Sequence, residues 1–235
     1  MRINKQVERI LKLTVVTSMT GAPFSLGADA TVSDETYDEW DRWFSNIVNE
    51  FVGDPLLDTI AAQWGTTADS ILDRLTIQGY LIYAEEIAGE RSGTEAGYRY
   101  DINQMVVEVP MWVFKTNNRM EVLQAMFHEF EHAARSSMGL IGAPLSYVQG
   151  EYGRDAMWTM IGDEQEHTAI MAQMADMLAM GYNDNEIITY ILDRQFKGEP
   201  EVQGMIPWYE QYLVAREHQL VSLLERTKRE YGVFL

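Results

Sequence analysis

The chain has 235 residues, and 18 lysine and arginine residues stand against 36 aspartate and glutamate residues, which gives a formal net charge of −18 at pH 7. Such an acidic protein lacks the basic surface that follows nucleic-acid phosphates or anionic lipids, so neither nucleic acid nor a membrane is an expected partner. The absence of cysteine excludes disulfides and thiolate ligands, so any metal must be bound by histidine and carboxylate. With 46% hydrophobic residues and this length, we expect a globular protein that is either one large domain or one domain with appended elements.

Residues 1–32 predict an N-terminal arm or helix outside the main domain. Basic residues precede the short apolar run ILKLTVVTSM, and Ala28-Asp29-Ala30 has the small-x-small form of a signal cleavage site. Lys12 interrupts the apolar run, so we expect an arm more than a cleaved signal and favour a cytoplasmic location over a secreted one. No run of 18 apolar residues predicts a transmembrane helix.

The segment from Ser33 to Asp54 predicts an amphipathic helix, because its apolar residues recur at close to a 3.6-residue period. These are Tyr37, Trp40, Phe44, Ile47, Val48 and Phe51. Two shorter helices are expected over residues 56–62 and 68–75, separated by Gly65 and capped by Thr66 or Thr67.

The next segments, LTIQGYLIYAEE and YRYDINQMVVEVPMWVF, are rich in β-branched and aromatic residues and predict two or three strands. The glycine-rich stretch AGERSGTEAG connects them. Met105, Val107 and Val109 alternate onto one face, and Pro110 suits the end of an edge strand.

The stretch MFHEFEHAARS contains the pattern His128-Glu129-x-x-His132. Residues four apart on a helix lie one above the other, so two imidazoles can share one metal, with Glu129 beside them. Asn118 and Glu121 form a variant capping box that marks the start of this helix. The alternative is a solvated polar face, but only four histidines occur in the chain and two of them fall at the metal spacing.

Beyond this helix, residues 139–153 predict a loop, and residues 155–180 a long helix that ends at Gly181. A short helix over residues 183–196 and a last helix over residues 207–230 follow. We expect a main domain over residues 33–200 and a C-terminal helix over residues 201–235 that packs on it.

Two histidines leave a zinc ion one protein ligand short, and the sequence GDEQEH offers candidates for the third. Helical spacing places Glu164 in the middle of an apolar stripe, where a carboxylate is costly unless it is paired or binds a cation. Glu166 falls nearly opposite and is expected to be solvated. His167, at the edge of the stripe, is a candidate metal ligand or an orienting partner of Glu164. A salt-bridged Glu164, or Asp163 or Asp155 as the ligand, are the alternatives.

With these residues the chain resembles the zincin superfamily of HExxH metallopeptidases, and its glutamate-ligand (gluzincin) branch in particular. The resemblance covers roughly residues 75–180 and rests on three segments: the strand ending VVEVP, the helix VLQAMFHEFEHAAR and the helix DEQEHTAIMAQMADML, which looks like an E-x-x-A-type third-ligand helix. His167 departs from it, because many of those families carry a small residue there.

The resemblance implies an α+β, mostly helical zincin-like fold with a small mixed β-sheet whose edge strand precedes the HExxH helix. It also implies a zinc-dependent metalloendopeptidase in which Zn²⁺ is held by His128, His132 and Glu164. A metal-activated water would then hydrolyse the peptide bond with Glu129 as general base. The strand from Gln104 to Val109 would hold a peptide or protein substrate by edge pairing. Candidates for stabilising the oxyanion are Tyr147, Tyr152, His167 and His218.

Two other classes of protein compete with this interpretation. Glu129-x-x-His132 and Glu164-x-x-His167 are two ExxH units, the element of ferritin-like di-iron carboxylate sites, although strands before His128 fit a four-helix bundle poorly. A non-catalytic zincin-like module for structure or binding is the third possibility.

Overall fold

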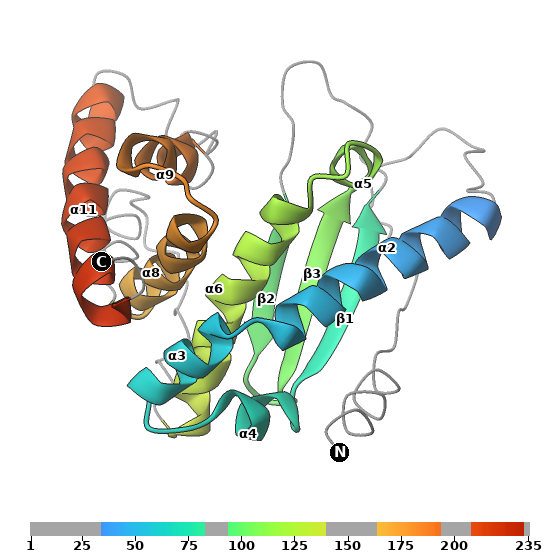
Figure 1. Cartoon of the computed structure of the whole chain (residues 1–235). Helices are drawn as coiled ribbons and strands as arrows, with labels where there is room; N and C mark the ends of the chain where they lie inside the picture. Colours follow the sequence, from blue (N-terminus) through green and yellow to red (C-terminus); the bar gives the residue numbers. More distant parts are fainter. Residues whose placement is uncertain (1–33, 83–93, 140–163, 194–207, 233–235) are drawn as a thin grey trace, which may run out of the picture.

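The computed structural model describes residues 34–82, 94–139, 164–193 and 208–232, which form helices around a small sheet (Figure 1). The expected α+β class is confirmed. The predicted arm over residues 1–32, the loop over residues 139–153 beyond Gly139 and the first part of the predicted helix at 155–180 lie outside the described residues.

The first described helix, α2 (Asp34–Gly53), follows the predicted 3.6-residue pattern. Its inward residues Trp40, Phe44, Ile47 and Phe51 are completely buried. Next come α3 (Leu56–Gln63) and α4 (Ala68–Leu72), and Thr67 caps α4 by accepting a hydrogen bond from the Ser70 amide. The helical segments predicted before the sheet are therefore confirmed, except that α4 ends at Leu72 instead of Leu75.

Within the described residues the sheet has three strands, β1 (Thr76–Ile82), β2 (Glu95–Arg99) and β3 (Gln104–Pro110), in the order β1-β3-β2. β3 runs parallel to β1 and antiparallel to β2, so it is the central strand. The predicted alternation of Met105, Val107 and Val109 toward the core is confirmed, since all three are completely buried.

The expectation that an edge strand precedes the HExxH helix is wrong. The strand before that helix is β3, and both of its edges are paired. Pro110 misled the prediction because it is the last residue of the strand, where a missing N–H leaves the interior ladder intact. The sequence analysis had included the next residues, MWVF, in a strand-rich segment. They form the short helix α5 (Met111–Lys115) instead.

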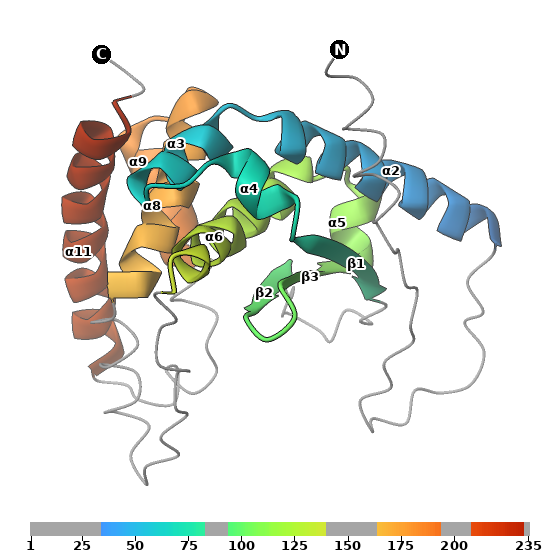
Figure 2. The same cartoon turned by 90° about the horizontal axis from the view of Figure 1, so that it is seen from below.

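The HExxH helix is α6 (Arg119–Ser137), which begins where predicted. The predicted capping box is not formed, because the Asn118 side chain makes no capping hydrogen bond and donates instead to the Glu121 carboxylate, 2.9 Å away. The side of the helix away from the two histidines is apolar, and its residues Leu123, Met126, Phe130 and Ala134 are buried. Figures 1 and 2 show α6 between the sheet and α8 (Glu164–Ala179).

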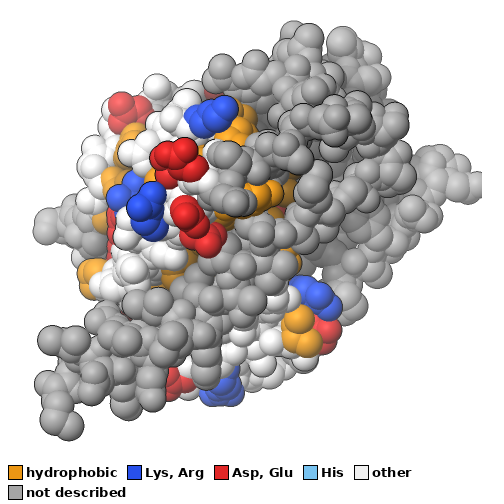
Figure 3. Space-filling model, turned by 90° about the vertical axis from the view of Figure 1, so that its right-hand side faces the viewer, with side chains coloured by type: hydrophobic (Ala, Val, Ile, Leu, Met, Phe, Trp, Pro, Cys, Tyr) orange, Lys and Arg blue, Asp and Glu red, His pale blue; other side chains and the backbone are white. Residues whose placement is uncertain are grey.

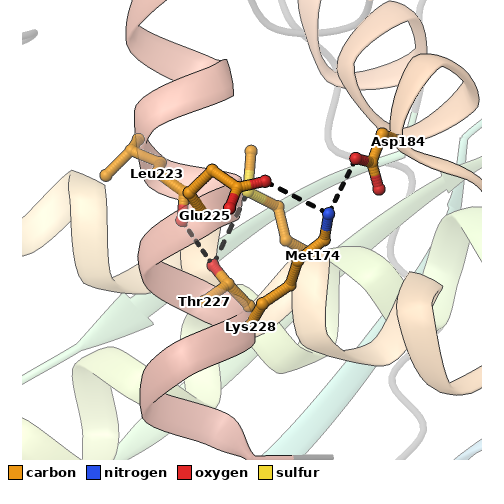
Figure 4. Close-up of polar contacts among 6 residues, drawn as sticks. All are labelled: Met174, Asp184, Leu223, Glu225, Thr227 and Lys228. Carbon is orange, nitrogen blue, oxygen red and sulfur yellow. Dashed lines mark hydrogen bonds and ion pairs between the residues drawn. The ribbon is translucent and has the colours of Figure 1, made fainter. Parts of the chain in front are cut away.

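The C-terminal helices pack on the outer side of α8. They are α9 (Asp184–Ile191), which has the capping box of Asn183 and Glu186, and α11 (Trp208–Tyr231). The Thr227 hydroxyl donates to the Leu223 carbonyl at 2.8 Å and lies 3.8 Å from Met174 Sδ of α8. Lys228 Nζ lies 2.7 Å from Asp184 of α9 and 3.2 Å from Glu225 of α11 itself. Thus Thr227 connects α11 with α8, and Lys228 connects it with α9 (Figure 4).

The surface on the side where α2 begins carries acidic and basic side chains close together, and no histidine is visible among its described side chains (Figure 3). In the part of the chain that the structure describes, no helix is both long enough and apolar enough to cross a membrane.

Candidate metal centre

The predicted histidines lie in a buried polar seam between α6 and α8. The two helices are antiparallel along this seam, so residues of rising number on α6 meet residues of falling number on α8. The Gln124 amide donates to the Asp176 carboxylate, and His128 Nδ1 lies 3.3 Å from Gln173 Oε1. At the end of the seam the Glu166 carboxylate reaches both histidines.

The Glu166 carboxylate bridges the two imidazoles of the HExxH pattern. Its Oε2 lies 3.3 Å from His128 Nε2, and its Oε1 lies 3.6 Å from His132 Nε2. The two imidazole rings lie edge to face, with their centroids 5.0 Å apart. The Nε2 atoms of both rings therefore face one carboxylate.

The other nitrogen of each ring faces an oxygen from the protein. Beside the Gln173 contact of His128, His132 Nδ1 lies 3.5 Å from Glu131 Oε2. Histidines that bind metals through Nε2 are commonly oriented by an acceptor at Nδ1. The surroundings of His128 thus match those of an Nε2 ligand, whereas His132 Nδ1 makes no hydrogen bond among the described residues.

Glu129 lies beside this group, and a ligand atom from each of His128, Glu129 and His132 can be chosen so that all three lie within 4.8 Å of one another. Its carboxylate is buried and interacts with the backbone N–H of Tyr98 in β2. Burial and the nearby Glu166 charge raise the pKa of Glu129, while His128 and the Tyr98 N–H lower it, and the net shift is upward. The outer edge of β2 therefore borders the centre.

Protonation in the metal-free protein follows from these contacts. Burial would lower the pKa of His128, but the hydrogen bond with Glu166 and the charges of Glu129 and Glu166 raise it to about 9. Burial would raise the pKa of Glu166, but its contacts with His128 and His132 lower it. Burial and the neighbouring His128 lower the pKa of His132 to about 4. A cation between these rings would thus replace the proton of His128.

Two of the distances are close to those around a tetrahedral metal ion. Zinc lies about 2.0–2.1 Å from histidine nitrogen and carboxylate oxygen, which places two ligand atoms about 3.3–3.4 Å apart at the tetrahedral angle. The separations of 3.3 Å and 3.6 Å between Glu166 and the two Nε2 atoms are close to this value, but they involve the two different oxygens of the carboxylate. The residues whose ligand atoms all lie within 4.8 Å of one another are His128, Glu129 and His132, so Glu166 would have to move to bind the same ion as both histidines. Two imidazoles and one carboxylate are also a common ligand set of catalytic zinc sites.

Glu166 was missed from the sequence, and the expectation that it would be solvated is wrong. The error came from treating α8 as a helix with one buried face. Instead α8 is buried almost all round, because α6 packs on one side and α11 on another. The spacing of Glu166, Gln173 and Asp176, seven and then three residues apart, is the polar stripe that meets α6. The sequence also contains the E-x-x-A pattern counted from this residue, as Glu166-x-x-Ala169. Counted from Glu164, the last position of the pattern is His167 instead of a small residue.

Glu164, the predicted third ligand, is the first residue of α8, and its side chain is not among those that the structure describes. Its assignment therefore stays a prediction. Its backbone lies two residues from Glu166, about 200° around the helix axis. Asp155 and Asp163, the alternative ligands, lie outside the described residues.

The other candidates fall in different places. The Gln219 amide of α11 lies 2.5 Å from His167 Nε2, so this nitrogen faces α11. His218 is exposed, and Tyr147 and Tyr152 lie outside the described residues. Tyr100, which the sequence did not single out, follows β2. Burial raises its pKa, and so do the charges of Glu129, Glu166 and Glu131, which places a neutral phenol near the carboxylates of the centre.

The alternative of a solvated polar face on the HExxH helix is wrong, because Glu121, Gln124, Glu131 and His132 are all buried.

Comparisons of the chain with protein-family models, curated proteins and solved structures find no match.

Proposed function

We propose that the protein is a zinc-dependent hydrolase of peptide bonds whose metal is held by His128, His132 and Glu166. The observation that carries the proposal is the convergence of both Nε2 atoms on one carboxylate, 3.3 Å and 3.6 Å away, with Glu129 beside them. Zinc bound there would lower the pKa of a water molecule and polarise a carbonyl group.

Glu129 is the general base in this proposal. The raised pKa of its buried carboxyl makes it a better proton acceptor than an ordinary glutamate. It would accept a proton from the attacking water and return it to the leaving amine, which must be protonated to depart. The hydrogen bond from Tyr98 N–H would hold the carboxylate in place during both transfers.

Substrate binding by the edge of β3 is not part of the proposal, because β3 is central. The outer edge of β2 borders α6, where the Thr94 N–H donates to Glu121 at 2.8 Å and the Tyr98 N–H interacts with Glu129. A peptide that approaches this edge would compete with α6 for these two groups.

Glutamine substitutions at positions 166 and 164 test the metal ligands directly. Glu166→Gln removes the anionic ligand, and we expect zinc to bind at least ~100-fold more weakly, beyond the usual effect of losing an orienting partner. Glu164→Gln is the matched control, two residues away on the same helix, and we expect its zinc affinity to be unchanged. Competition with a chromophoric chelator measures both affinities. A loss confined to Glu164→Gln would restore the ligand predicted from the sequence and refute Glu166.

Substitution of Glu129 tests the catalytic role separately from metal binding. Glu129→Gln keeps the shape of the side chain but cannot accept a proton, so we expect peptide cleavage to fall by about 10²–10⁴-fold while the zinc content stays that of the unmodified protein. Digestion of a peptide library, read by mass spectrometry, gives the rate. Undiminished cleavage by this variant would mean that the activity comes from elsewhere.

A further inference from the structure

A hollow of about 260 Å³, its open mouth included, lies between α4, the turn after β2 and the C-terminal half of α6 (Figure 2). Its buried wall is apolar and is formed by Ile71, Leu75 and Ala133. Its exposed rim is polar and includes Arg74, Asn103 and Ser137. Pockets that enclose a whole small ligand usually exceed about 300 Å³, so this hollow has room for one end of a larger ligand.

Two contacts with Ser70 orient Arg74 at this rim. Arg74 Nε donates to the Ser70 carbonyl oxygen at 3.3 Å, and Nη2 donates to the Ser70 hydroxyl at 3.1 Å. Among the described residues no carboxylate oxygen lies within 4 Å of this guanidinium, although the chain has 36 acidic and only 18 basic residues. The N–H groups that are not bonded to Ser70 are therefore available to a carboxylate, which arginine binds through two parallel hydrogen bonds.

Asn103 offers a second donor at the same rim. The Tyr98 hydroxyl donates to Asn103 Oδ1 at 2.8 Å, which assigns the oxygen of this amide. Within the described part of the chain, Asn103 Nδ2 makes no hydrogen bond. The rim thus presents a charged and a neutral donor to a ligand that enters from solvent.

The order of polar rim and apolar wall determines which end of a ligand fits. A carboxylate at the tip of a side chain would finish against the apolar wall, where its burial is costly. An apolar side chain on that wall, with a carboxylate left at the rim, meets complementary groups at both places. In a peptide, the last residue has this arrangement, because its side chain and its α-carboxylate leave the same carbon atom.

The hollow and the proposed general base lie on one stripe of α6. Glu129, Ala133 and Ser137 are four residues apart, so they follow one another along the helix in steps of about 6 Å. Tyr98 lines the hollow, and its backbone N–H interacts with Glu129. An extended peptide spans about 3.3–3.6 Å per residue, so its end would reach the hollow two or three residues beyond a bond held at Glu129.

We propose that this hollow is a subsite for the carboxyl-terminal residue of a peptide, with the apolar side chain on the buried wall and the α-carboxylate at Arg74 and Asn103. The inference rests on the proposed function in taking that peptide as a substrate of the metal centre. The hydrolase would then release the last two or three residues of a peptide and would require their free carboxylate. Binding of the peptide end itself requires neither zinc nor cleavage.

Calorimetric titration of the metal-free protein tests this binding by itself. The probe is acetyl-Ala-Ala-Val, and its carboxyl-terminal amide is the matched comparison, because the two peptides differ only in the carboxylate. We expect the acid to bind about tenfold more tightly than the amide, which is the usual effect of one hydrogen bond to a charged group. Equal affinities for acid and amide, or no binding of either, would overturn the proposal.

Two arginine substitutions assign the contact with the carboxylate. Arg74→Gln removes the charge at the rim, and we expect this variant to bind acid and amide equally well. Arg99→Gln is the control, since it removes the same charge from an arginine that pairs with Asp101 at 3.4 Å, and we expect the preference for the acid to remain. Both arginines are exposed, so both variants should fold, which circular dichroism checks. A preference for the acid that survives in Arg74→Gln would overturn the assignment.

Cleavage by the zinc-loaded protein distinguishes this inference from the proposed function. A longer peptide that ends in Ala-Ala-Val is compared as free acid and as amide, and mass spectrometry identifies the products. We expect release of the last two or three residues from the acid and about tenfold slower cleavage of the amide. Equal cleavage of both forms would overturn the subsite and leave the hydrolase intact. No cleavage, together with a preserved preference for the acid in the titration, would refute the proposed function and leave the binding site.

Discussion

At the scale of single residues, the seam between α6 and α8 contains a buried aspartic acid whose ionisation lowers the stability of the folded protein. Asp176 is 2% exposed and accepts a hydrogen bond from the Gln124 amide. Burial and the charges of Asp54 and Glu50 raise the pKa of Asp176 to about 7, while the hydrogen bond from Gln124 lowers it. The unfolded chain has the ordinary, lower value, so between about pH 4 and pH 7 the folded state binds more protons than the unfolded state. The contribution of this group to stability therefore falls as the pH rises through that range.

Asp176→Asn removes this penalty, and its new amide can donate to Gln124 Oε1, which has no hydrogen-bond partner among the described residues. We expect the variant to gain stability over the unmodified protein on the order of a few kcal/mol at pH 8 and almost nothing at pH 4. Urea unfolding at both pH values measures the difference. A gain that is equal at the two pH values would mean that the ionisation of Asp176 is not the cause.

The residues of the centre could be predicted from sequence only where a local pattern fixes them. His128, Glu129 and His132 come together because one helix turn places them so, whatever the rest of the chain does. The meeting of Glu166 with the two histidines depends on how α8 is rotated about its axis, and that rotation is set by packing against α6 and α11.

At the scale of elements, the sheet is held to α2 by a close contact that requires glycine. A Cβ at Gly79 of β1 would lie 2.5 Å from ring carbons of Phe44, and Phe44 is completely buried in α2. We expect Gly79→Ala to destabilise the protein by about 1–3 kcal/mol, since overpacking forces buried groups to shift. Gly97→Ala in β2 is the control, because a Cβ there meets nothing within 4 Å. Thermal unfolding of the two variants measures the difference, and equal stability would refute the close contact.

Most elements could be predicted because their signals are local. The caps at Thr67 and Asn183 and the apolar stripe of α2 are readable within one turn of helix or a few residues. Strand order is not local, because β1 and β3 are parallel and more than 20 residues separate them along the chain. The sequence therefore indicated a strand at Gln104–Val109 but misplaced it at the edge of the sheet.

At the scale of the whole molecule, the proposed metal centre depends on a layered arrangement that runs from the sheet through α6 and α8 to α11 (Figures 1 and 2). The Tyr98 backbone brings the sheet to Glu129, while α8 supplies Glu166 to the two histidines. The arrangement gives no support to the di-iron alternative, since His167 Nε2 contacts Gln219 and faces α11.

The most direct test of the central claim is metal analysis by mass spectrometry of the protein purified without added metal, with His132→Ala as the paired control. The account predicts about one zinc per chain, as one set of three protein ligands requires, and its loss in the control. About two irons per chain, or zinc that survives in His132→Ala, would contradict the metal centre proposed between α6 and α8.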